Sequence, residues 1–157
     1  MKKIGLIVLV LIWSLVIFMF SNTNSTSSNN LSKSIGGTII SITNYLKITN
    51  VTDNNREDAI TMINKPIRKL AHITEYFILS ILVFNLLKKF KIRGAKYYLT
   101  FIICFSYSLL DEFHQTFING RTGQFIDCII DMIGVIIYLG IVVIATKRSK
   151  KSRYEEV

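Results

Sequence analysis

Long apolar segments, separated by polar and basic ones, dominate the pattern of this chain. Residues 4–20 carry no charged side chain, and further apolar blocks cover residues 70–87, 97–110 and about 126–146. Because a helix rises about 1.5 Å per residue, a block of about 20 residues matches the ~30 Å hydrocarbon core of a bilayer. The pattern therefore predicts an all-α integral membrane protein with four transmembrane helices.

The block at residues 97–110 is too short to cross a bilayer by itself. As a helix, its fourteen residues reach only about 21 Å. The polar residues Asp111, Glu112 and Gln115 follow it. We expect the helix to continue through these residues, or the bilayer to thin beside it.

Basic residues flank the apolar blocks unequally and predict the orientation of the chain. They collect at the N-terminus, between the second and third blocks and after the fourth, and such clusters mark the cytoplasmic side. With four crossings both termini are then cytoplasmic, and the net charge of +9 divides between a basic inner side and a near-neutral outer side. The inner basic residues are Lys2, Lys3, Lys88, Lys89, Lys91, Arg93, Lys96, Lys147, Arg148, Lys150, Lys151 and Arg153.

The predicted organisation has four parts. An uncleaved N-terminal anchor (residues 1–20) is favoured over a cleaved signal peptide, because its apolar run is long and does not end in small residues. An extracytoplasmic segment with interfacial helices (residues 21–69) follows. A three-helix membrane core (residues 70–146) and a basic cytoplasmic tail (residues 147–157) complete the chain.

The extracytoplasmic segment predicts a linker and two helices. Residues 21–30 are polar and turn-prone, and apolar residues then recur at helical spacing. That amphipathic helix either lies on the outer face of the membrane or packs over the outer end of the bundle. A second short helix is expected over residues 56–63, capped by Asp53-Asn54-Asn55, and Pro66 should occupy the first turn of the next span. The apolar residues of the first helix are Leu31, Ile35, Ile39, Ile42 and Leu46.

Ionisable residues within the apolar blocks are the main candidates for function, because charges in hydrocarbon are costly and usually face a bundle interior or a cavity. Counted from the cytoplasmic ends at ~1.5 Å per residue, they lie about 20–30 Å deep, in one layer near the outer surface. On three helices, residues three or four apart share a face, as His72 and Glu75 do. We expect an outward-opening ligand pocket. Its predicted residues are Lys69, His72, Glu75, Asp111, Glu112, Gln115, Arg121, Asp127 and Asp131.

Four of these residues are candidate catalytic groups: His72, Glu75, Asp111 and Glu112 are suited to general acid–base chemistry. The pair His72-x-x-Glu75 also has the spacing of half a helical metal site, but such pairs are common by chance, and a hydrogen-bonded polar pair at a helix start is the favoured explanation. The metal and any cofactor stay unassigned.

Arg121 is flanked by glycines in the turn-forming sequence at residues 119–123. A planar guanidinium in an accessible turn suits a phosphate or a carboxylate of a ligand. The alternative is that Arg121 pairs with Asp127 or Glu112 of the chain itself.

Three motifs carry a resemblance to a known family: RKxxHxxEY at residues 68–76, DExxQxF at residues 111–117, and GRx(5)Dx(3)DxxG at residues 120–134. In combination they resemble the VanZ-like family of bacterial membrane proteins, over about residues 65–140. That family is named for a protein associated with low-level resistance to the glycopeptide teicoplanin. The resemblance implies a multi-pass protein of the bacterial plasma membrane with a role in the cell envelope. Where many members have Asn, this chain has Asp131.

Two functions of different class follow as hypotheses. The first is binding of an envelope lipid or a glycopeptide-like ligand in the outer pocket, with a contribution to teicoplanin resistance implied by the resemblance. The alternative is a membrane-embedded enzyme that modifies a lipid or cell-wall-precursor headgroup through His and carboxylate groups. The expected partners are membrane lipids and a lipid-linked envelope precursor or glycopeptide. Nucleic acid is not expected, because uninterrupted apolar runs explain the basic residues through membrane topology.

Overall fold

The computed structural model describes residues 3–92 and 94–155, and every regular element in these ranges is helical. Lys2 and Arg93, two of the predicted cytoplasmic residues, lie outside the described residues. The predicted all-α class is confirmed. The elements are α1 (Lys3–Ser21), α2 (Ser25–Tyr45), a 3-10 turn η1 (Asp53–Asn55), α3 (Arg56–Lys89), α4 (Lys96–Gln115) and α5 (Phe125–Glu155).

Three helices in the described part of the chain, not four, are long and apolar enough to cross a membrane. They span Lys3–Ser21, Asp53–Lys89 and Phe125–Ser149. The prediction of four such helices was wrong for α4. The apolar part of α4 is too short, because Asp111, Glu112 and Gln115 occupy the last turns of the helix.

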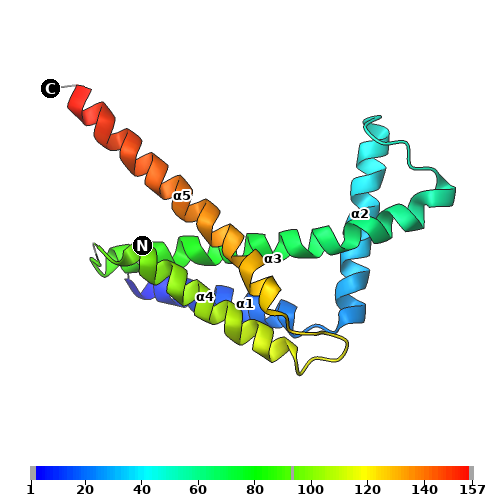
Figure 1. The fold of residues 1–157 in the computed structure, drawn as a ribbon, viewed down its shortest axis with the longest axis horizontal. Coiled ribbons are helices and arrows are strands. Elements are labelled where there is room, and N and C mark those ends of the chain that lie inside the picture. The colour runs from blue at the N-terminus through cyan, green and yellow to red at the C-terminus, as the bar shows by residue number, and fades with distance from the viewer. Residues whose placement is uncertain (1–2, 93, 156–157) are drawn as a thin grey trace.

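The helices form a bundle with two distinct ends. α1 and α4 run toward the end where α2 lies, and α3 and α5 run back (Figure 1). The start of α1 and the end of α5 therefore lie at the end opposite α2, which we call the basic end. There the ammonium of Lys3 lies 5.1 Å from the centre of the Phe90 ring, which joins α1 to the end of α3. We call the other end, where α4 meets α5, the pocket end.

α3 is the central helix, because it contacts each of the other four. Its residues Tyr76, Leu79 and Val83 form the core together with Ile17 of α1 and Val135 of α5. All five side chains are at most 2% exposed. Apolar residues elsewhere on α1, α4 and α5 point outward, as expected for helices that face lipid.

Gly134 allows α5 to approach the backbone of α3. A Cβ atom there would meet the carbonyl oxygen of Ile73 and lie 2.9 Å from the nitrogen of Phe77. Small residues serve this purpose widely in membrane helix pairs. Gly140, six residues further along α5, has no neighbour within 4 Å of such a Cβ among the described residues.

Two expectations for the outer segment were wrong. The predicted linker over residues 21–30 is largely helical, because Asn24 caps α2 by accepting a hydrogen bond from the backbone of Ser27 at 2.9 Å. No separate helix ends at residue 63, and Pro66 lies inside the continuous α3 rather than in a first turn. Ile63 and Ile67, on either side of Pro66, pack against the glycine face of α2.

Candidate functional site

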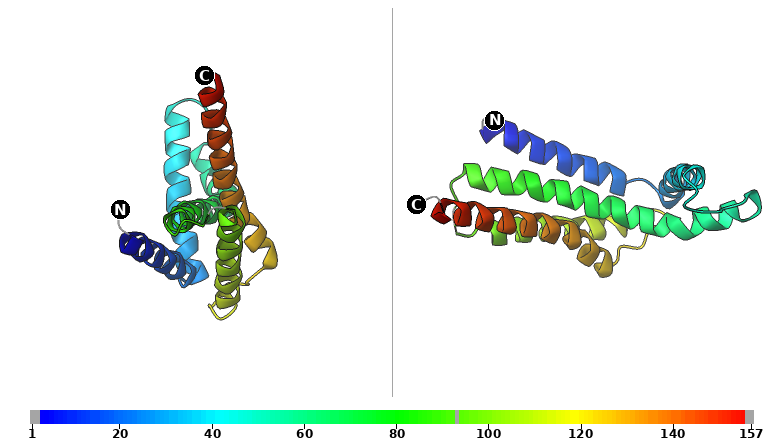
Figure 2. Two further views of the ribbon diagram at one scale, coloured as in Figure 1. Left: turned by 90° about the vertical axis from the view of Figure 1, so that its left-hand side faces the viewer. Right: turned by 90° about the horizontal axis from the view of Figure 1, so that it is seen from above.

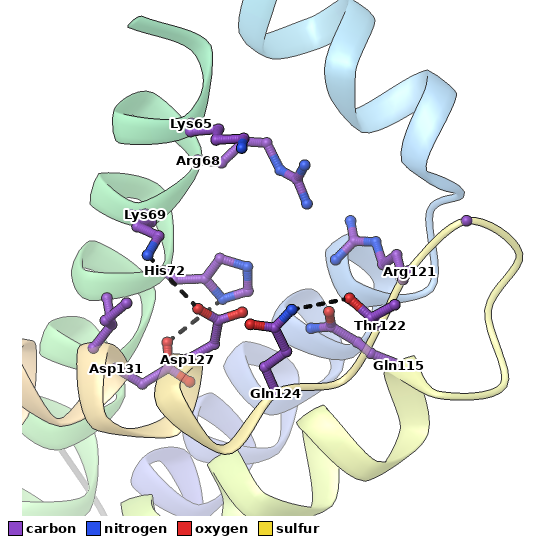
Figure 3. Close-up of a pocket in the computed structure, with 12 residues that line it drawn as sticks. Lys65, Arg68, Lys69, His72, Gln115, Arg121, Thr122, Gln124, Asp127 and Asp131 are labelled. Atoms are coloured by element: carbon purple, nitrogen blue, oxygen red, sulfur yellow. Dashed lines mark hydrogen bonds and ion pairs between the residues drawn. The ribbon is translucent and has the colours of Figure 1, made fainter. Parts of the chain in front are cut away.

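A polar cavity of about 340 Å³ opens at the pocket end of the bundle (Figure 3). It lies between α3, the start of α5 and the loop that joins α4 to α5. We call it the pocket. Its lining residues are Lys65, Arg68, Lys69, His72, Gln115, Gly120, Arg121, Thr122, Gln124, Asp127, Ile130 and Asp131.

One face of α3 supplies most of the positive charge. Arg68, Lys69 and His72 lie three, four and seven residues after Lys65, which places all four along a single helical stripe. The ammonium of Lys69 lies 4.0 Å from a carboxylate oxygen of Asp127, so α3 and α5 are joined across the pocket.

Arg121 projects from the loop on the opposite side. The preceding Gly120 has a φ of 76°, a left-handed conformation that glycine adopts without strain. Nη2 of Arg121 donates to the carbonyl oxygen of Phe20 at 3.2 Å and to the hydroxyl of Thr23 at 3.3 Å. The loop is therefore attached to the end of α1, a contact for which the sequence offers no indication.

The remaining guanidinium nitrogens of Arg121, Nε and Nη1, are buried and have no hydrogen-bond partner among the described residues. The alternative of an ion pair with Asp127 or Glu112 is not found in the described part of the chain. In Figure 3, the guanidinium groups of Arg121 and Arg68 instead point toward one another across the pocket. Burial, and after it the nearby positive charge of Arg68, lowers the pKa of Arg121 from its ordinary value. Two cations thus face one another, and neither forms an ion pair with a carboxylate among the described residues.

A histidine and two acids lie together at the inner side of the pocket. Nδ1 of His72 is 3.6 Å from a carboxylate oxygen of Asp131 and 3.8 Å from one of Glu75. Asp131 is fully buried, and its other oxygen accepts a hydrogen bond from the Ser108 hydroxyl at 2.6 Å. The predicted pairing of His72 with Glu75 therefore includes a third member from α5.

Asp111 lies deeper, where α4 meets the end of α1. It accepts a hydrogen bond from the Ser21 hydroxyl at 2.7 Å and a longer one from the Gln115 amide at 3.3 Å. All three side chains are buried. The contact of Ser21 with Asp111 was not predicted, because nothing in the sequence around Ser21 indicates which residue it contacts.

Glu112 has a role in holding the loop. One of its carboxylate oxygens accepts the backbone N–H of Gln124 at 2.9 Å, just before α5 begins. A Cβ atom at Gly123 would meet the backbone carbonyl of Glu112, so the loop packs directly on the end of α4.

The pocket thus contains most of the predicted ligand-binding set. Glu75, Asp111 and Glu112 do not line it and instead make contacts behind it or beside it. Lys65 and Arg68 line it although they were not in the predicted set; their place on the stripe of Lys69 and His72 was the available indication. The predicted residues that line the cavity are Lys69, His72, Gln115, Arg121, Asp127 and Asp131.

Metal binding finds no geometric support in the residues that the structure describes. No group of three or more His, Cys, Asp or Glu side chains among them is arranged to hold an ion. The cysteines Cys104 and Cys128 are both buried and unpaired with each other.

Comparison with known proteins tests the resemblance suggested by the three motifs. The family model described as VanZ/LLP1 matches residues 6–146, which adds α1 and α2 to the region that the motifs cover. No curated protein and no solved structure gave a match. Since the family model covers nearly all of the helical bundle, the chain belongs to the VanZ/LLP1 family.

Proposed function

We propose that this protein is a multi-pass protein of the bacterial plasma membrane whose pocket opens outward and binds an anionic group of an envelope ligand. The basic end would face the cytoplasm. Lys3, Lys88, Lys89 and Lys96 lie at helix ends on that side of the bundle, and Lys147 lies in the C-terminal part of α5. The positive-inside rule then places the pocket at the outer surface.

The proposal includes a fourth crossing by α4. This helix runs between the same two bundle ends as its neighbours and packs against α1, α3 and α5. Its polar residues Asp111, Glu112 and Gln115 are at most 6% exposed, so they face protein rather than lipid. A helix whose polar turns are covered in this way can cross with a lower hydropathy than an isolated span requires. Four crossings place both termini in the cytoplasm.

The observation that carries the proposed ligand class is that Nε and Nη1 of Arg121 are buried without a hydrogen-bond partner among the described residues. Four cationic side chains line the pocket, against two aspartates of which one is already paired with Lys69. Buried charges are ordinarily paired, and a guanidinium fits a phosphate or carboxylate through two parallel hydrogen bonds. A phosphate- or carboxylate-bearing headgroup would supply the partner that Arg121 lacks.

The ligand is then an envelope lipid, a lipid-linked cell-wall precursor or a glycopeptide-like molecule. Membership of the VanZ/LLP1 family fits a connection with teicoplanin. We propose low-level glycopeptide resistance as the consequence of binding in cells, and it requires its own test.

Binding by the reconstituted full chain tests the proposal. Arg121→Ala should weaken the binding of a lipid phosphate by at least about tenfold, since a charge-assisted hydrogen bond contributes about 1.5–3 kcal/mol. Arg121→Lys should restore part of it, because the charge returns without the planar fork. Lys147→Ala, which removes an exposed charge at the basic end, is the matched control. Equal affinity for all four proteins, with unchanged thermal unfolding, would contradict the proposal.

The cluster of His72, Glu75 and Asp131 favours a second candidate, a membrane-embedded enzyme. A histidine 3.6 and 3.8 Å from two carboxylates has the components of general acid–base catalysis. Purified protein should then convert an envelope lipid or precursor, and His72→Ala and Glu75→Gln should each abolish turnover. If the wild-type protein bound the ligand without any turnover, binding would be the only function supported and the enzyme candidate would be excluded.

A further inference from the structure

α2 presents three faces with different surroundings. The first packs against α3: Ser32 and Ile40 are 4% and 5% exposed. A Cβ atom at Gly36, between them on this face, would lie 3.3 Å from the Ile63 side chain and 3.4 Å from that of Ile67. The contact is therefore a close one between the small-residue face of α2 and the part of α3 outside the core.

The second face is polar and points toward the start of α3. Arg56, the first residue of α3, donates to the carbonyl oxygen of Gly37 at 3.2 Å and to the Ser41 hydroxyl at 2.8 Å. The start of α3 is the part of that helix farthest from the basic end. This side of α2 therefore points away from the bundle, where water would lie.

The third face is an apolar stripe formed by Leu31, Ile35, Ile39 and Ile42. These side chains are 42–56% exposed, so each keeps about half of its surface open. No charged side chain lies on this stripe, since Lys33 is the one charged residue of α2 and lies on another face.

The direction of the apolar stripe follows from the helix rotation. A Cβ atom at Gly37 would lie near Arg56 and Ile60 of α3. A Cβ atom at Gly36 would instead lie near Ile63 and Ile67, which are closer to the membrane-spanning part of α3. Ile35 and Ile39 lie further round α2 in that same sense, because each step back along a helix turns about 100°. The stripe therefore faces the side of the spans.

α2 also lies across the bundle rather than along it. Figure 1 shows it at a steep angle to α3, and the right-hand view of Figure 2 shows it nearly end-on. A helix that crosses the spans at their outer end runs parallel to a membrane surface. At that same end, Met19, Phe20 and Leu70 are 50–62% exposed, so the apolar surface of the spans continues up to α2.

We infer that α2 lies flat in the outer interface of the bilayer, with Leu31, Ile35, Ile39 and Ile42 inserted among the lipid acyl chains. An amphipathic helix of this kind sinks its apolar face about 5–10 Å into the boundary between headgroups and chains. α2 is also linked to the pocket, because its Asn29 accepts hydrogen bonds from Arg68 at 3.3 Å and from Asn64 at 3.4 Å. Lipid would thus help to fix the position of a pocket cation.

Spin labels on the full chain, reconstituted into phosphatidylcholine–phosphatidylglycerol vesicles, test this inference. Labels at Ile35→Cys and Ile39→Cys should collide several-fold more with oxygen, which concentrates in lipid, than with a water-soluble nickel chelate. Ser34→Cys, exposed on the water side of α2, is the matched control and should show the reverse. Unsubstituted protein gives the labelling blank, because Cys104 and Cys128 are fully buried.

Two outcomes would overturn the inference. Strong collision with the nickel chelate at all three positions would place the apolar stripe in water. Weak collision with both reagents at Ile35 and Ile39 would mean that protein, such as a second copy of the chain, covers the stripe instead of lipid. Neither result depends on which ligand the pocket binds, so the proposed function and the lipid contact can fail separately.

Discussion

Single residues decide how the buried charges of the pocket are balanced, and Asp131 is the clearest case. One of its oxygens accepts from Ser108, and the other is buried without a hydrogen-bond partner among the described residues, 3.6 Å from His72. A buried acceptor that lacks a donor reduces stability. The resemblance to VanZ-like proteins implies asparagine at this position, and asparagine would keep the acceptor for Ser108 while adding a donor toward His72.

Asp131→Asn is therefore expected to stabilise the protein, by about 1 kcal/mol, which corresponds to about 2–4 °C in thermal unfolding for a chain of this size. Asp131→Ala is the comparison: it leaves Ser108 without its acceptor and should lower the unfolding temperature. Thermal unfolding of both variants in detergent measures the difference. If asparagine destabilised the protein as much as alanine, the buried carboxylate would be needed for stability.

Whole elements are positioned by close backbone contacts, and the contact between α5 and α3 sets the geometry of the pocket. Asp127 and Asp131 reach the pocket only because Gly134 lets α5 lie against the backbone of Ile73 and Phe77. α4 depends on a different arrangement, since its polar turns are covered by the end of α1 and by the loop before α5.

Gly134→Ala should separate α5 from α3 and destabilise the protein by about 1–3 kcal/mol, the usual cost of overpacking. Gly140→Ala is the matched control on the same helix. It meets open space and, because alanine favours helix, should leave stability unchanged or raise it by up to about 1 kcal/mol. Thermal unfolding of the two variants side by side provides the measurement. Equal effects of the two substitutions would show that the close approach of α5 to α3 at Gly134 does not limit the stability of the protein.

At the scale of the whole molecule, charge separates two ends of one bundle. The basic end collects lysines from the ends of α1, α3 and α4 and from the C-terminal part of α5. The pocket end collects the buried acids together with Arg68 and Arg121. A net charge of +9 therefore describes neither end. It reflects the asymmetry that orients membrane proteins.

This orientation predicts which loops are reached from outside the cell. In intact cells, Thr122→Cys at the pocket should react with a membrane-impermeant maleimide, whereas Lys91→Cys, in the turn after α3, should react only after permeabilisation. Thr122 and Lys91 are both exposed and lie outside the helices. The reverse pattern would place the pocket in the cytoplasm and rule out an extracellular ligand.

Much of this architecture was predictable from the sequence, because it depends on local spacing. Apolar runs, their basic flanks and the pairing of polar residues three or four apart indicated the helices, the two ends and the layer of buried acids. The turn before α5 and the shortness of the apolar part of α4 were equally apparent. The resemblance to the VanZ-like family also depends on motifs within short segments, and the family model over residues 6–146 confirms it.

Only the tertiary structure decided which of those polar residues face the same space. It directs Asp127 and Asp131 into the pocket, ties Asp111 to Ser21 of α1 and Glu112 to the loop, and leaves Arg121 facing Arg68. It also turns the apolar stripe of α2 toward the spans. The physical reason is that periodicity fixes which residues share a face of their own helix, whereas the partner of that face is set by the packing of helices far apart in the chain.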